Sequence, residues 1–149
     1  MKHFILYFIL GICAIGTAQT QHYNTSKGYV AKGYDVVAYF QNKAVKGRQQ
    51  FTTFHDNVKY KFVSQENLKY FEASPENYIP QYGGYCAYAI GITGKKVGVN
   101  PKTFEIRDGK LYLFYNSFGV NTLMKWREED IVNLKEKADK NWYKMGGAQ

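Results

Sequence analysis

Cysteine is scarce in this chain of 149 residues, which has two, at positions 13 and 86. The two lie far apart, so the Cys-x-x-Cys signature of thiol–disulfide exchange is missing. Walker-type phosphate loops, dinucleotide glycine fingerprints and Ser-His-Asp signatures are missing as well. Internal repeats and low-complexity tracts do not occur either, and no linker divides the chain. The sequence therefore carries no standard enzyme motif and predicts one domain.

Long hydrophobic runs are also lacking. The longest, Phe4–Ile15, has about a dozen residues, whereas a membrane span needs roughly 20. Lys2 precedes this run, and Gly16-Thr17-Ala18 follows it with the small residues that a signal peptidase reads. We predict a signal peptide over residues 1–18, no stable membrane span after its removal, and export to the periplasm or the cell exterior. A retained N-terminal anchor is the alternative.

Basic residues outnumber acidic ones, 20 to 12, which gives a net charge of +8 and a pI of 9.3. They are scattered and form no dense run, whereas a nucleic-acid interface needs clustering, so nucleic acid is not an expected partner. A cationic surface favours anionic envelope polymers or lipids, although ordinary solubility explains it equally well. A small ligand or a metal ion is the partner we expect. The sequence leaves the oligomeric state open.

Polar residues without periodicity occupy positions 19–28, which we interpret as a flexible leader before a domain over residues 29–145. Val36–Phe40 is a short apolar run of residues that favour strands. Two further strands are predicted on either side of a turn at 55–57, because apolar and lysine residues alternate over 58–62. Asp108-Gly109 separates two more apolar runs and is a strong hairpin signal.

Helical patterns alternate with these strands. Ser64 is a suitable N-cap for a helix beginning at the next residue, and Pro75 favours a new first helical turn. Residues 85–90 could form the start of a helix or a buried strand; their alanines favour a helix that Gly91 could end. Apolar spacing over 123–142 predicts closing helices. The whole pattern predicts a small α+β fold with short antiparallel strands and three or four helices.

Three segments carry a family resemblance: GYDVVAYF (33–40), YKFVSQENLKYFEASPENYIPQYGGYCAYA (60–89) and DGKLYLFYN (108–116). Together they resemble the exported bacterial YHS-domain proteins over roughly residues 30–143. The resemblance implies a small α+β domain and, from the wider superfamily, a link to heavy-metal handling. Metal-type members place cysteines in the first segment and before the serine of the second. This chain has no cysteine in the first segment and Val63 at the second position.

Cys86 is the one thiol left after signal cleavage, and three interpretations stay open. It could bind copper or another soft metal ion together with His55. It could act as a nucleophile, activated by His55 or by the start of a helix. It could equally be a small apolar side chain of the core, packed against residues such as Val36, Phe62 and Leu68.

Glycine and tyrosine surround this cysteine and suggest a ligand pocket at whose edge the thiol would be partly buried. Glycine pairs permit close backbone approach, and tyrosines form aromatic walls with polar tips. The candidate pocket residues are Asp35, Tyr39, Gly83, Gly84, Tyr85 and Tyr88. Our leading hypothesis is an exported cell-envelope module that binds a soft metal ion or a small ligand near Cys86. The alternatives are a purely structural or interaction domain and, third, a cysteine-dependent enzyme.

Overall fold

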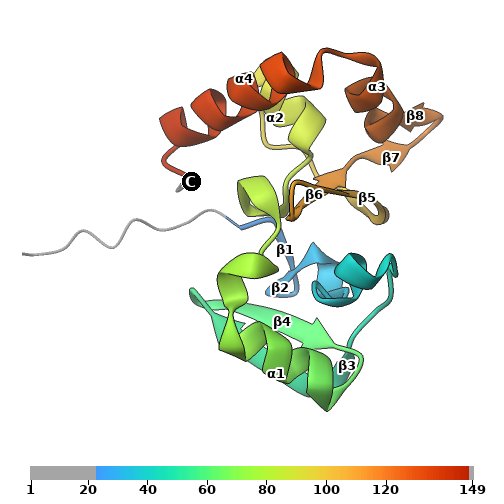
Figure 1. Cartoon of the computed structure of the whole chain (residues 1–149), viewed down its shortest axis with the longest axis vertical. Coiled ribbons are helices and arrows are strands. Elements are labelled where there is room, and N and C mark those ends of the chain that lie inside the picture. The colour runs from blue at the N-terminus through green and yellow to red at the C-terminus, as the bar shows by residue number, and fades with distance from the viewer. Residues whose placement is uncertain (1–22, 148–149) are drawn as a thin grey trace, which may run out of the picture.

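The computed structural model describes residues 23–147, and the predicted signal peptide lies outside them. The chain forms four α-helices, four short 3-10 helices (η1–η4) and eight strands within these residues (Figure 1). The predicted α+β class is therefore confirmed. The elements, in chain order, are β1 (Thr25–Ser26), β2 (Tyr29–Val30), η1 (Ala31–Gly33), η2 (Ala38–Gln41), β3 (Arg48–His55), β4 (Val58–Phe62), α1 (Gln65–Ala73), η3 (Pro75–Asn77), η4 (Gln81–Gly84), α2 (Ala87–Thr93), β5 (Asn100–Arg107), β6 (Lys110–Phe114), β7 (Asn116–Ser117), β8 (Val120–Asn121), α3 (Thr122–Glu128) and α4 (Ile131–Lys144).

A four-stranded sheet in the order β1-β2-β4-β3 forms one half of the molecule. The β3–β4 hairpin is antiparallel, as its alternating pattern predicts, whereas β2 and β4 pair in parallel. Helix α1 lies across one face of this sheet (Figure 1). It begins where expected, because the Ser64 hydroxyl accepts a hydrogen bond from the Asn67 amide at 3.1 Å.

The other half contains the β5–β6 hairpin and helices α2, α3 and α4 (Figure 1). The predicted Asp-Gly turn joins the two strands, with Asp108 and Gly109 both at positive φ. Two buried clusters occur in the described residues. The first joins the large sheet and α1 to Cys86 and to Leu111 and Leu113 of β6, and the second contains Trp126 and Trp142. None of the helices between residues 23 and 147 is long and apolar enough to cross a membrane.

Two local predictions were wrong. Residues 38–41, expected in a strand, form the 3-10 helix η2, because the Asp35 carboxylate accepts the amides of Val37 and Ala38 and starts a turn. Helix α2 ends at Gly94, whose φ is 63°, and not at Gly91. A Cβ at Gly91 would lie 2.5 Å from the Leu134 Cδ1 atom, so this glycine permits close packing of α2 against α4.

Ordered structure begins before residue 29, the boundary expected from sequence. Residues 25 and 26 form β1, and Asn24 is hydrogen-bonded through its amide to the Gly83 carbonyl and through its side chain to the Gly84 carbonyl. Tyr23 is buried and its hydroxyl donates to Asp56. The second half of the predicted leader is thus part of the fold.

Candidate functional site

An open pocket of about 500 Å³ lies where η1 meets the loop before β5 and the end of β6. This volume falls within the range of small-molecule sites. Backbone and mostly short side chains line the pocket, and they present amide, hydroxyl and ammonium groups to it. Its lining residues are Lys32, Val97, Gly98, Val99, Asn100, Pro101, Tyr115, Asn116 and Ser117.

Two asparagines fix the polar wall of this pocket. The Asn100 carboxamide donates to the Asn116 carbonyl at 3.3 Å and accepts the Lys102 amide at 3.0 Å. The Asn116 carboxamide donates to the Thr103 hydroxyl at 3.0 Å. The bonds from Asn100 to Asn116 and from Asn116 to Thr103 cross between β5 and β7, so the wall is held by side chains as well as by strand pairing. Each carboxamide nitrogen carries two hydrogens and has one of them left for a ligand.

Lys32 supplies the positive charge at this pocket and sits on strained backbone. Its φ is 54°, and Ala31 before it has φ 50°, so two successive residues with side chains adopt the left-handed conformation. That conformation costs roughly 1–2 kcal/mol for a residue other than glycine. Lys32 is exposed and has no ion-pair partner among residues 23–147. The left-handed backbone places Lys32 among the residues that line the pocket, and its side chain brings an unpaired positive charge there.

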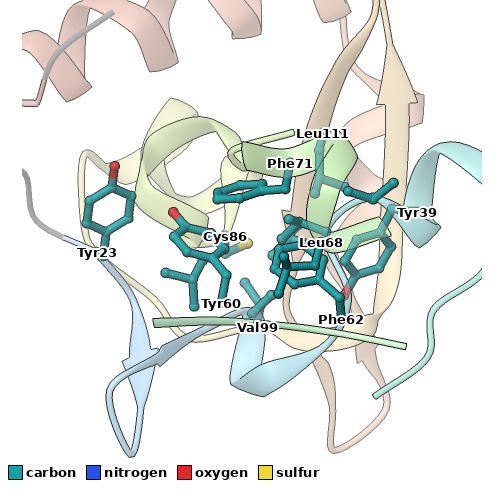
Figure 2. Close-up of a cluster of buried hydrophobic side chains, with 14 residues drawn as sticks. Tyr23, Tyr39, Tyr60, Phe62, Leu68, Phe71, Cys86, Val99 and Leu111 are labelled. Carbon is teal, nitrogen blue, oxygen red and sulfur yellow. The ribbon is translucent and has the colours of Figure 1, made fainter. Parts of the chain in front are cut away.

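Cys86 lies behind the wall of this pocket and not at its surface. The residue is 0% exposed and shares a buried cluster with Val36, Phe62 and Leu68, as the core interpretation expects (Figure 2). Its amide donates to the Val97 carbonyl at 2.9 Å. The expectation of a partly buried thiol at the edge of a tyrosine-lined pocket was wrong, because the Cys86 chain segment runs beneath the loop that forms the pocket.

A short hydrogen-bond chain leads from the thiol to the pocket wall. The Cys86 sulfur lies 3.2 Å from the Thr122 hydroxyl oxygen, and that hydroxyl donates to the Tyr115 carbonyl at 2.8 Å. Because a threonine hydroxyl has a single hydrogen, the thiol must be the donor to Thr122. Cys86 and Thr122 thereby hold the backbone of two lining residues, Val97 and Tyr115.

His55, the second predicted metal ligand, lies elsewhere, at the turn between β3 and β4. Its Nε2 atom is 3.4 Å from the carboxylates of both Asp56 and Glu76. In the described part of the chain no hydrogen bond joins His55 to Cys86, and no group of three or more His, Cys, Asp or Glu residues could hold a metal ion. His55 packs against the rings of Tyr60 and Phe71, which belong to the same buried cluster as Cys86.

Asp35, a candidate pocket residue, is fully buried and satisfied by the protein itself. One carboxylate oxygen accepts the Val37 and Ala38 amides at 2.9 and 3.0 Å. The other accepts the Val63 amide and the Asn67 carboxamide, both at 2.8 Å. The carboxylate therefore starts η2 and ties it to the junction of β4 and α1, which leaves no position for a ligand.

Tyr39 is also buried, and its hydroxyl donates to the Pro101 carbonyl at 2.6 Å. Burial raises the pKa of this hydroxyl well above its usual range. The Tyr39 ring packs on Phe104 at 4.7 Å and borders a second depression of about 340 Å³ beside Glu105 and Arg127. Tyr39 thus supports the first pocket from behind, through Pro101.

Gly83 and Gly84 form a left-handed turn with Tyr82 before them, at φ values of 59°, 81° and 55°. Their carbonyls accept the two hydrogen bonds from Asn24 described above. The N-terminal segment thus bonds to the carbonyls of the pair, while a Cβ at Gly84 would meet only ordinary contacts of 3.4–3.9 Å with Pro80, Val30 and Leu113, so its positive φ is what favours glycine there. The Tyr82 hydroxyl donates to Asp139 at 2.8 Å, which anchors the turn to α4.

Tyr85 and Tyr88 are half-buried and do not line the 500 Å³ pocket. The Lys96 ammonium lies 5.6 Å from the centre of the Tyr85 ring, which packs beside Trp142. Tyr88 packs against both buried clusters. Burial raises its pKa, as do Glu129 and Glu128 nearby. Tyr88 thus contacts both buried clusters, whereas Tyr85 belongs to the cluster around Trp142.

Lys32, Asn100 and Asn116 are the functional candidates that the sequence did not reveal. Each comes from a different segment, and an isolated lysine or asparagine in a loop gives no signal. Comparison with protein-family models, with curated proteins and with solved structures finds no match for this chain. The kind of ligand is therefore inferred from the site's geometry, while export and the YHS resemblance stay predictions from the sequence.

Proposed function

We propose that this chain is an exported cell-envelope binding module of the YHS type, which takes a small anionic ligand in the pocket between Lys32 and Asn116. The observation that carries the proposal is that Lys32, an unpaired lysine on strained backbone, lines a pocket of about 500 Å³. Strained backbone concentrates at functional sites, where its cost is compensated by the surrounding structure. Here the surrounding structure includes the hydrogen bonds of Asn100 and Asn116.

The pocket chemistry favours a ligand with one acidic group and several hydroxyls. An ammonium group attracts a carboxylate or a phosphate as a point charge. Carboxamide hydrogens and the Ser117 hydroxyl suit the oxygens of a polyol. A sugar acid combines both features in a molecule that a pocket of this size can hold.

The metal form of the hypothesis receives less support from the geometry. A soft metal ion needs a deprotonated thiolate and further ligands, whereas Cys86 is sealed in the core with one hydroxyl beside it. The same burial removes the thiol from any substrate, so a cysteine-dependent enzyme is not favoured. Burial of Cys86 supports the rival function, a structural or interaction domain in which the pocket stays empty.

Isothermal titration of the protein with acetate, inorganic phosphate, glucuronate and glucose tests the proposal. Glucuronate should bind more tightly than glucose, which has the same ring and no charge. Lys32→Gln should weaken glucuronate binding by up to about fivefold, since an exposed charge contributes up to about 1 kcal/mol. Lys110→Gln, which removes one exposed charge at the β5–β6 turn, is the matched control and should leave binding unchanged.

Equal affinity for glucuronate and glucose, or no binding of any of the four compounds, would contradict the proposal and favour the structural domain. Copper(I) added in a parallel titration distinguishes the metal hypothesis. Its stoichiometric binding, lost in Cys86→Ala, would show that Cys86 is a ligand despite its burial.

A further inference from the structure

Charge is distributed unevenly along this chain. Residues 23–63 contain seven lysines and arginines against two acidic residues, Asp35 and Asp56. Residues 64–147 contain twelve basic and ten acidic residues. Asp35 is buried with its hydrogen bonds satisfied, so it does not offset surface charge in solvent. The part of the molecule built on the four-stranded sheet therefore carries most of the excess positive charge.

Two of these lysines stand side by side on the face of the sheet opposite α1. Tyr60 and Phe62 are buried on the side of α1. Because side chains alternate along a strand, Lys59 and Lys61 point to the other face. Both ammonium groups lie over the ring of Tyr29 on the neighbouring strand β2, at 4.5 and 4.0 Å from its centre. The ring holds two like charges near each other, and attraction to its face offsets part of their repulsion.

This lysine pair has no acidic partner. None of the ion pairs within residues 23–147 includes Lys59 or Lys61. In a protein with twelve acidic residues, an unneutralised pair fixed by an aromatic ring is a concentrated positive potential on a flat surface.

A large apolar side chain stands on the same face. Phe54 on β3 is directly opposite Lys59 in the antiparallel register, and directly opposite residues project to the same side of a sheet. Phe54 is 70% exposed. Thr52, opposite Lys61, continues the row without adding charge. The face therefore combines fixed cations with one projecting aromatic ring.

We propose that this face, defined by Tyr29, Phe54, Lys59 and Lys61, docks onto an anionic lipid surface. The lysines would lie at the level of the phosphate groups, where each contributes about 1 kcal/mol, and Phe54 would enter the interfacial region. An anionic polysaccharide fits less well, because the Tyr29 ring is already covered by lysines and cannot stack on a sugar. The inference is independent of the ligand pocket and of its occupant.

Co-sedimentation with lipid vesicles tests the proposed docking surface. The protein used is the chain without its predicted signal peptide. The protein should bind phosphatidylcholine vesicles that contain phosphatidylglycerol, bind phosphatidylcholine alone poorly, and dissociate as salt is raised. Lys59→Gln/Lys61→Gln should weaken binding at least about tenfold. Phe54→Thr, which keeps a strand-favouring residue at an exposed position, should weaken it severalfold without changing the salt dependence.

The matched control is Lys137→Gln/Lys140→Gln, which removes two exposed charges from α4 and should leave vesicle binding unchanged. Circular dichroism of each variant checks that the fold is retained. Equal losses in the two double variants would overturn the proposal, because net charge alone would then explain binding. Heparin binding as tight as vesicle binding, with the same dependence on Lys59 and Lys61, would also overturn it in favour of a soluble polyanion.

Discussion

Replacing Asp35 by asparagine should cost this protein about 3 kcal/mol of unfolding free energy. The carboxylate accepts four hydrogen bonds, two on each oxygen, and the residue is 0% exposed. Asparagine keeps one oxygen and turns the other into a donor. In the less costly orientation, the NH2 group of the new asparagine side chain points toward Asn67, whose carboxamide can rotate so that its oxygen accepts a hydrogen bond. The backbone amide of Val63 then loses its acceptor.

The magnitude follows from those bonds. An unsatisfied buried amide costs about 1–3 kcal/mol, and the remaining bonds lose the strength that a charged acceptor gives them. Urea unfolding followed by circular dichroism measures the difference. Asp130→Asn is the matched control, since Asp130 caps α4 at an exposed position where asparagine is as good a cap. If Asp35→Asn costs no more than Asp130→Asn, the reasoning fails.

Asn67, which donates a hydrogen bond to the Asp35 carboxylate, offers a further check. In Asp35→Asn/Asn67→Asp the carboxamide and carboxylate exchange places, so the bond between positions 35 and 67 regains a charged acceptor. This double variant should recover part of the loss, about 1 kcal/mol, relative to Asp35→Asn. Absence of any recovery would show that the contact between the two side chains contributes nothing measurable.

Three further predictions concern single substitutions, at Glu105, Gly84 and Lys32. Burial alone would raise the pKa of Glu105, but hydrogen bonds from Arg107 and Arg127 outweigh burial and lower this pKa in the folded protein. The ionised Glu105 therefore stabilises the fold above about pH 4.3, the usual pKa of glutamate, and this stabilisation is lost as the pH falls through the lower folded pKa. Glu105→Gln should cost about 2 kcal/mol at pH 7 and remove that acid-dependent loss in urea titrations. Gly84→Ala forces a side chain to φ 81° and should cost about 1–2 kcal/mol; an unchanged thermal midpoint would refute this. Lys32→Gly should raise stability by up to about 1 kcal/mol in thermal unfolding and weaken glucuronate binding, and lower stability would show that Lys32 is not strained.

Local patterns predicted much of this fold correctly. The hairpin over 48–62 and the Asp-Gly hairpin depend on alternation and turn residues a few positions apart, and the cap at Ser64 acts on a residue three positions away. The run 36–40 was misinterpreted because its apolar residues suit a strand equally well. The feature that decides its structure is the Asp35 carboxylate, half of whose donors lie about 30 residues away.

The site was harder to predict for a related reason. Its pocket is formed by three segments, at residue 32, residues 97–101 and residues 115–117, which only the folded chain brings together. The burial of Cys86 likewise depends on remote partners, since Val97 covers its backbone and Thr122 its sulfur. The partner of the Gly83 and Gly84 carbonyls, Asn24, was not recognisable in a polar leader.

The most direct test of the proposed ligand site is a chemical-shift map. Glucuronate titrated into the 15N-labelled protein should shift the amides of residues 97–100 and 115–117 together with Lys32, in a saturable manner. In Lys32→Gln the same amides should shift less at the same glucuronate concentration. The amide of Cys86, which is hydrogen-bonded to Val97 behind the wall, should shift less than the amides that line the pocket. Shifts confined to other surfaces, such as the depression beside Tyr39 and Arg127, or no saturable shift at all, would contradict the account.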